Sequence, residues 1–134
     1  MNNDEISEIF NKWNNLKIRI HKSERFLYPK AREIWWVNLG QNIGVEVSGK
    51  NHGFERPVVV IKIFNKYGAL VAPTTSKMKD DKNFVYFLNG KSIPNAVNMA
   101  QTRSVSLKRF IRKIEDMNIS DFERVKAKLL SFLI

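Results

Sequence analysis

A nearly continuous apolar run from Pro57 to Phe64 is the feature that most restricts how this chain folds. Such a run, rich in Val and Ile, is typical of a strand that is buried on both faces. The turn sequence Asn65-Lys66-Tyr67-Gly68 follows it, and residues 69–72 read as a returning strand that Pro73 ends. The sequence therefore predicts an antiparallel hairpin in the core of the domain.

Helices are predicted at both ends of the chain. Near the N-terminus an amphipathic stripe ends close to Ser23 and is formed by Ile6, Ile9, Phe10, Trp13, Leu16 and Ile20. We expect this helix to lie over the rest of the domain or over a partner subunit. Near the C-terminus, Ser120 and Glu123 have the spacing of a capping box ahead of a second apolar face.

Short strands connected by turns fill the region between the helices. The predicted elements are strands at 33–38, 84–88, 94–100 and 112–115, a turn at Asn89-Gly90 and a helical turn at 106–110. The glycine-rich segment 39–55 reads as a long loop, and long loops in small domains are often functional. Strands in hairpin order between terminal helices predict an α+β fold, with a small antiparallel β-barrel and both helices packed outside it.

Net charge is the strongest compositional signal. The chain carries 23 Lys and Arg against 13 Asp and Glu, a net charge of +10, which favours contact with a polyanion such as nucleic acid. With no cysteine and two histidines, thiol nucleophiles, disulfides and zinc sites with several imidazole ligands are excluded. No apolar run approaches the roughly 20 residues that span a bilayer. The polar, acidic N-terminus is unlike a secretory signal, so we expect a cytoplasmic protein without contact to a membrane.

The sequence has no phosphate-binding loop of the Walker type, no dinucleotide fingerprint and no Gly-x-Ser-x-Gly elbow, so no cofactor is expected. RNA cleavage is a reaction that can proceed with so few catalytic groups, because the 2′-hydroxyl of the substrate is the nucleophile. Arg56, between the glycine-rich loop and the buried strand, is suited to stabilise the phosphate because a guanidinium matches phosphate oxygens. The alternative is an ordinary rim arginine paired with Glu55 or Glu46.

Two adjacent threonines follow the second strand of the predicted hairpin. Antiparallel pairing brings residue 73 back towards residues 57–60, which places Thr74 and Thr75 beside Arg56. A threonine hydroxyl there would add a hydrogen bond to the same phosphate. The alternative is that both threonines are turn and capping residues, a commoner role after a proline.

Basic segments flank this candidate site. Ser76, Lys77 and Lys79 follow the threonines, and Arg103 begins a second cluster that continues through Lys108, Arg109, Arg112 and Lys113. Together with apolar faces at Phe54, Met78 and Phe84, they could track a single RNA strand. The alternative for any such charge run is a solvated face.

Five stretches of the sequence resemble, in order and approximate spacing, the MazF/PemK toxins of bacterial toxin–antitoxin systems. They are Ile34-Trp35-Trp36-Val37-Asn38-Leu39-Gly40, Gly44-Val45-Glu46, Glu55-Arg56-Pro57-Val58-Val59-Val60-Ile61, Ala72-Pro73-Thr74-Thr75-Ser76-Lys77 and Gln101-Thr102-Arg103-Ser104. The resemblance divides the chain into an N-terminal helical extension at 1–30 and a toxin-like domain at 31–134.

This resemblance implies an SH3-like barrel, of the kind shared with CcdB toxins, that forms a homodimer. It also implies cleavage of single-stranded RNA at short sequences without metal, leaving 2′,3′-cyclic phosphate and 5′-hydroxyl ends. By the family motifs, Arg56 is the general acid and phosphate stabiliser, Thr75 (or Thr74) assists it, and Glu46 is a base or orients Arg56. The expected RNA contacts are His52, Phe54, Thr74, Ser76, Lys77, Lys79, Gln101 and Arg103, and Gln101 also suits a place at the barrel rim or the dimer interface.

A toxin of this kind has a cognate antitoxin. An acidic, disordered antitoxin segment would match the basic groove, since charge complementarity steers such pairs together. The competing hypothesis is a noncatalytic module on the same barrel that binds nucleic acid or a protein target such as a topoisomerase.

Overall fold

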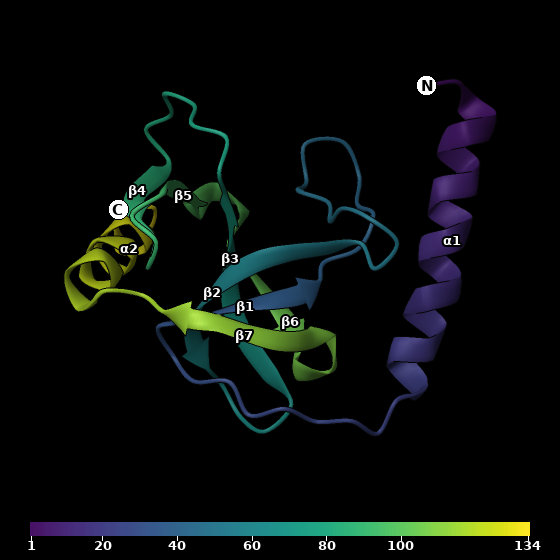
Figure 1. Ribbon diagram of the computed structural model, residues 1–134, viewed down its shortest axis with the longest axis horizontal. Coiled ribbons are helices and arrows are strands. Elements are labelled where there is room, and N and C mark those ends of the chain that lie inside the picture. The colour runs from purple at the N-terminus through teal and green to yellow at the C-terminus, as the bar shows by residue number, and fades with distance from the viewer.

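The chain folds into seven strands between two terminal helices, as Figure 1 shows in the computed structural model, which describes residues 1–134. The helices are α1 (Asn3–Lys22) and α2 (Ile119–Ser131). The strands are β1 (Glu33–Asn38), β2 (Glu55–Ile63), β3 (Gly68–Thr75), β4 (Phe84–Leu88), β5 (Pro94–Asn98), β6 (Arg103–Ser106) and β7 (Phe110–Asp116). Two 3₁₀ turns, η1 (Met99–Gln101) and η2 (Leu107–Arg109), precede β6 and β7. The predicted α+β class is confirmed.

All strand pairs are antiparallel, and the sheet is open. Its strand order is β4-β5-β3-β2-β1-β7, and β6 pairs with β3 outside that path. The two outer strands are linked by a side chain, because the Gly90 main-chain N–H after β4 donates to the Glu115 carboxylate of β7 at 3.1 and 3.2 Å. The predicted barrel is therefore a curved sheet whose hydrogen-bond ladder does not close.

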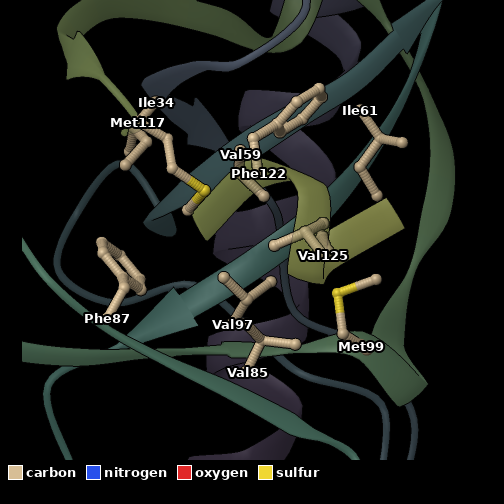
Figure 2. Close-up of a cluster of buried hydrophobic side chains, with 11 residues drawn as sticks. Ile34, Val59, Ile61, Val85, Phe87, Val97, Met99, Met117, Phe122 and Val125 are labelled. Atoms are coloured by element: carbon tan, nitrogen blue, oxygen red, sulfur yellow. The ribbon is translucent and has the colours of Figure 1, made fainter. Parts of the chain in front are cut away.

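Strand β2 is buried on both faces, as the apolar run predicted. Val58 and Val60 belong to one hydrophobic cluster, and Val59 and Ile61 belong to another on the opposite face. Figure 2 shows the second cluster, in which α2 contributes Phe122 beside Val59. Alternate residues of this one strand thus join the two halves of the core.

Strand β3 continues past Pro73, so the predicted end of this strand is wrong. Pro73 pairs with Val58 of β2, whereas Thr74 and Thr75 pair with Val97 and Ala96 of β5 on the other side of β3. Proline within sheets is confined to edges and irregular positions, and Pro73 stands where pairing with β2 ends and pairing with β5 begins. The extension carries Thr75 on a strand, not on a loop.

Other element boundaries also differ from the prediction. Strand β2 begins at Glu55, so Arg56 lies inside the strand and pairs with Val37 of β1. The predicted strand at 94–100 ends at Asn98, where η1 begins, and the predicted strand at 112–115 extends over β7. Strand β6 was not predicted.

The N-cap of the C-terminal helix lies two residues before the predicted cap. Asn118 is the N-cap residue, and its side-chain oxygen accepts hydrogen bonds from the Ser120 main-chain N–H at 2.9 Å and from the Ser120 hydroxyl at 2.6 Å. Because Ser120 already donates to Asn118, the capping box predicted for Ser120 and Glu123 does not form.

Helix α1 stands at the side of the sheet and reaches it through a long connection at 23–32 (Figure 1). It ends at Lys22, as predicted, and Trp13 is its one buried residue. The Trp13 ring packs on Phe54 with ring centroids 5.6 Å apart. The helix therefore lies over the domain, as expected, and is held by the buried Trp13 side chain and by Lys108, whose Nζ donates to the His21 carbonyl oxygen at 2.6 Å.

Candidate active site

Arg56 and Thr75 line the same pocket, which has a volume of about 250 Å³. Arg56 comes from β2 and Thr75 from the extended end of β3, and these strands are antiparallel neighbours. The full lining is Val47, Ser48, Lys50, Arg56, Thr75, Lys77, Lys79, Phe84 and Asn98. Four of these side chains are cations and none is a carboxylate, so the pocket is suited to an anion.

The Arg56 side chain is held by the main chain of the preceding loop. Its Nε donates a hydrogen bond to the Ser48 carbonyl oxygen at 2.9 Å, and no protein group accepts from its two terminal nitrogens. Glu55 pairs instead with Arg112 at 3.5 Å, and Glu46 accepts from the Ile43 main-chain N–H. Arg56 is therefore not the ion-paired rim arginine of the alternative interpretation. Partial burial lowers the pKa of Arg56 below the ordinary value of an arginine.

The two threonines occupy different environments. Thr74 is 4% exposed, and its hydroxyl donates to the Pro57 carbonyl oxygen at 3.4 Å. Thr75 is half-buried at the pocket wall, and its hydroxyl oxygen accepts from the Lys77 main-chain N–H at 3.1 Å. The Thr75 hydroxyl proton therefore remains available to donate, so the pocket geometry favours Thr75 over Thr74.

Glu46, Gln101 and Arg103 line an adjoining cleft of about 430 Å³, which shares Val47 with the pocket. Gln101 holds the glycine-rich loop: its side-chain oxygen accepts from the Val47 main-chain N–H at 3.0 Å, and its side-chain nitrogen donates to the Val45 carbonyl at 3.1 Å. Gln101 is thus placed as a structural rim residue. Glu46 lies outside the pocket that contains Arg56.

His52 and Phe54 face α1 and do not line the pocket with Arg56. Both border a cleft of about 610 Å³ beside that helix. Phe54 is 8% exposed because Trp13 covers its ring, so the expectation of a free stacking face at Phe54 is corrected. Ser76 is exposed but also lies outside the pocket lining, whereas Lys77 and Lys79 are part of it.

Four pocket residues were not predicted from the sequence, namely Val47, Ser48, Lys50 and Asn98. Ser48 contributes a main-chain carbonyl to Arg56, and any residue type carries that group, so no sequence signal marks it. Lys50 could have been found, because it lies in the same glycine-rich loop that leads to Arg56.

No group of three or more His, Asp or Glu side chains is close enough to hold a metal ion. Neither helix combines the length and the apolar character needed to cross a bilayer.

The fold and the pocket define a class: a small α+β domain whose open antiparallel sheet carries a cationic pocket built on two neighbouring strands. The chain belongs to the PemK-like, MazF-like toxin family of type II toxin–antitoxin systems, whose model matches residues 30–133. No curated protein matches the sequence significantly.

Solved structures of other proteins share the fold. MazF from Deinococcus radiodurans is 21% identical with a TM-score of 0.66, and the match covers 80% of this chain and 97% of that chain. A MazE–MazF structure from the same organism is 19% identical with a TM-score of 0.61, covering 80% and 96%. A mycobacterial endoribonuclease in complex with its cognate antitoxin is 9% identical with a TM-score of 0.62, covering 79% and 95%. At these sequence identities, the similarity to the solved structures shows the fold alone.

Proposed function

We propose that this protein is a toxin that cleaves single-stranded RNA at specific sequences without a metal ion. The observation that carries the proposal is the single cationic pocket that contains both Arg56 and Thr75. The products of the cleavage would be a 2′,3′-cyclic phosphate and a 5′-hydroxyl. The 2′-oxygen forms a new bond to phosphorus as the bond from phosphorus to the 5′-oxygen breaks.

Arg56 has the main role in this reaction. Its terminal nitrogens have no acceptor within the protein and can donate two parallel hydrogen bonds to phosphate oxygens as charge develops on them. The Ser48 carbonyl accepts from Nε, the third nitrogen of the guanidinium, so the two terminal nitrogens are oriented before RNA binds. Burial lowers the pKa of Arg56, which makes it a stronger acid towards the departing 5′-oxygen while it stays charged at neutral pH.

Thr75 and the lysines complete the phosphate site. The Thr75 hydroxyl can donate to a further phosphate oxygen, and Lys50, Lys77 and Lys79 neutralise the flanking backbone. Glu46 is proposed as the base that takes the 2′-hydroxyl proton when RNA extends from the pocket into the adjoining cleft. Orientation of Arg56 by Glu46 has no contact to support it, because the Ser48 carbonyl already fills that role.

The test is cleavage of a labelled single-stranded RNA library by purified protein with excess EDTA. We expect sequence-specific cleavage with 5′-hydroxyl ends, and we expect Arg56→Ala to bind the same RNA without cutting it. Binding without cleavage by the wild-type protein would favour the noncatalytic module instead. Cleavage that disappears on chelation and returns with added metal would contradict the proposed mechanism.

We propose further that the protein acts in the cytoplasm as a homodimer, with an antitoxin as its inhibitor. The MazE–MazF structure and the structure of a mycobacterial endoribonuclease with its cognate antitoxin support a protein inhibitor. An inhibitor segment rich in Asp and Glu would match the carboxylate-free pocket. Light scattering would test the dimer, and co-expression with the neighbouring gene product would test the inhibition.

A further inference from the structure

The geometry points to helix α1 as the element that positions Arg56, through the side chain of Trp13; this inference rests on the proposed function. The helix lies wholly outside the family match, which begins at residue 30. Trp13 is its one fully buried side chain, although its apolar stripe is much longer. The Trp13 ring is therefore the principal apolar contact of the helix with the domain, beside the bond from Lys108 Nζ to the His21 carbonyl oxygen.

Trp13 covers both ends of the glycine-rich loop at once. Its ring packs on Phe54, and it lies so close to Gly40 that a Cβ atom on that glycine would be 2.5 Å from the Trp13 Cζ2 atom. The Arg109 guanidinium lies 5.7 Å from the ring centroid and donates to the carbonyl oxygens of residues 38–39 at 3.0 and 3.1 Å. The ring thus fills the space where the loop leaves β1 and returns to β2.

The two loop ends are bonded to each other beneath this ring. The Phe54 carbonyl oxygen accepts from the main-chain N–H groups of Leu39 at 2.8 Å and of Gly40 at 3.1 Å. Phe54 has a φ of +48°, a strained value for a bulky residue, which persists only where its surroundings hold it. Main-chain hydrogen bonds to Asn51, Leu39 and Gly40 hold this conformation, and the Trp13 ring packs over the Phe54 side chain.

A short path leads from these ends to the catalytic guanidinium. Gly49 donates its main-chain N–H to the Gly40 carbonyl at 2.8 Å, and the adjacent Ser48 carbonyl accepts from Arg56 Nε at 2.9 Å. If Trp13 is removed, Gly40 and Phe54 lose the ring that covers them, and the Gly40–Gly49 bond loses its support at the Gly40 end. The Asn42 main-chain N–H still donates to the Ser48 hydroxyl at 2.8 Å, so we expect the Ser48 carbonyl to shift and not to be released. A displacement of about 1 Å at a reacting group can reduce a rate by roughly 100-fold.

The experiment compares the folded full-length variants Trp13→Ala, Trp13→Phe and Ile18→Ala. Ile18 is the matched control, since it is an apolar residue of the same helix that is 44% exposed. For Trp13→Ala we expect kcat for RNA cleavage to fall about 10- to 100-fold with KM changed less than about twofold, because orientation is lost and not phosphate contact. Trp13→Phe should restore most of kcat, and Ile18→Ala should match the wild type.

A second readout does not depend on activity. In the wild type the Arg56 Nε–H should exchange slowly with solvent, because it is bonded to the Ser48 carbonyl; in Trp13→Ala it should exchange faster. An unchanged kcat and unchanged exchange in Trp13→Ala, or equal losses in Trp13→Ala and Ile18→Ala, would overturn the inference. If the wild-type protein does not cut RNA, the proposed function fails, and the exchange rates alone still decide whether Trp13 positions Arg56.

Discussion

Arg56 and Ser48 are joined by a hydrogen bond of 2.9 Å in which the arginine Nε donates to a main-chain carbonyl. The bond runs from a strand to the loop before it, so the direction of the guanidinium depends on loop geometry as well as on β2. A lysine at position 56 would keep the positive charge but would lose both this bond and the paired terminal donors.

We therefore predict that Arg56→Lys fails to restore cleavage. The expected loss in kcat is about 100- to 1,000-fold, the range seen when one preorganised donor to a developing negative charge is removed. Binding of an uncleavable RNA with 2′-deoxy nucleotides should change only a few-fold. Arg112→Lys is the matched control, because Arg112 is exposed and pairs with Glu55. Near wild-type cleavage by Arg56→Lys would contradict the assigned role.

Substitution of Thr75 should lower activity, whereas substitution of Thr74 should affect only stability. Thr75→Val removes a hydroxyl at the pocket wall and should lower kcat roughly 10-fold or more, since a hydrogen bond to a charged group is worth about 1.5–3 kcal/mol. Thr74→Val should leave kcat unchanged and alter the free energy of unfolding by about 1 kcal/mol at most, because its hydroxyl only contacts the Pro57 carbonyl at 3.4 Å. Single-turnover cleavage and urea unfolding of both variants decide between them, and the reverse pattern would make Thr74 the site threonine.

The sequence predicted the relationship between Arg56 and Thr75 because it depends on one hairpin. The apolar run and the turn at 65–68 set the pairing of β2 with β3, and that pairing brings the two residues to one pocket. Strand β6 was not predicted because it is only four residues long and Val105 is its one apolar residue. The geometry of the loop around Ser48 could not be predicted because main-chain hydrogen bonds form it, and these leave no pattern in the side-chain sequence.

Salt dependence should identify the lysines that contact RNA. For single strands, the slope of log K against log salt concentration changes by about 0.7 for each phosphate neutralised. Lys77→Ala should therefore reduce the slope for RNA binding by about this amount, because Lys77 lines the pocket. Lys126→Ala is the control: Lys126 belongs to α2 and pairs with Glu123 at 2.9 Å. Equal slopes for Lys77→Ala and the wild type would place the RNA elsewhere.

Glu33 should make the stability of the domain depend on pH at the acidic end. Burial alone would raise the pKa of Glu33, but hydrogen bonds from Lys113, from the Lys30 main-chain N–H and from the Trp35 indole outweigh it and lower that pKa below the ordinary 4.5. A lowered pKa in the folded state adds stability above the ordinary value, and this stability is lost as the pH falls through the lowered value.

Glu33→Gln tests this dependence. At neutral pH it should reduce the free energy of unfolding by about 1–2 kcal/mol, because hydrogen bonds to a charged acceptor are lost. The difference from the wild type should shrink as the pH falls below 4.5. Urea unfolding of both proteins at neutral and acidic pH gives the measurement, and a difference that grows on acidification would contradict the assignment.

Two of the groups proposed for the reaction lie on strands, whereas Glu46 and the surrounding lysines lie on connections. Arg56 belongs to β2 and Thr75 to β3, whereas Lys50 is carried by the glycine-rich loop and Lys77 and Lys79 by segment 76–83. The glycine-rich loop carries Glu46 and the Ser48 carbonyl as well as Lys50, so a change in its length would disturb the proposed reaction itself. Segment 76–83 contributes Lys77 and Lys79 but no proposed reacting group, so under the proposed function a change there would alter the RNA contacts and leave the reacting groups in place.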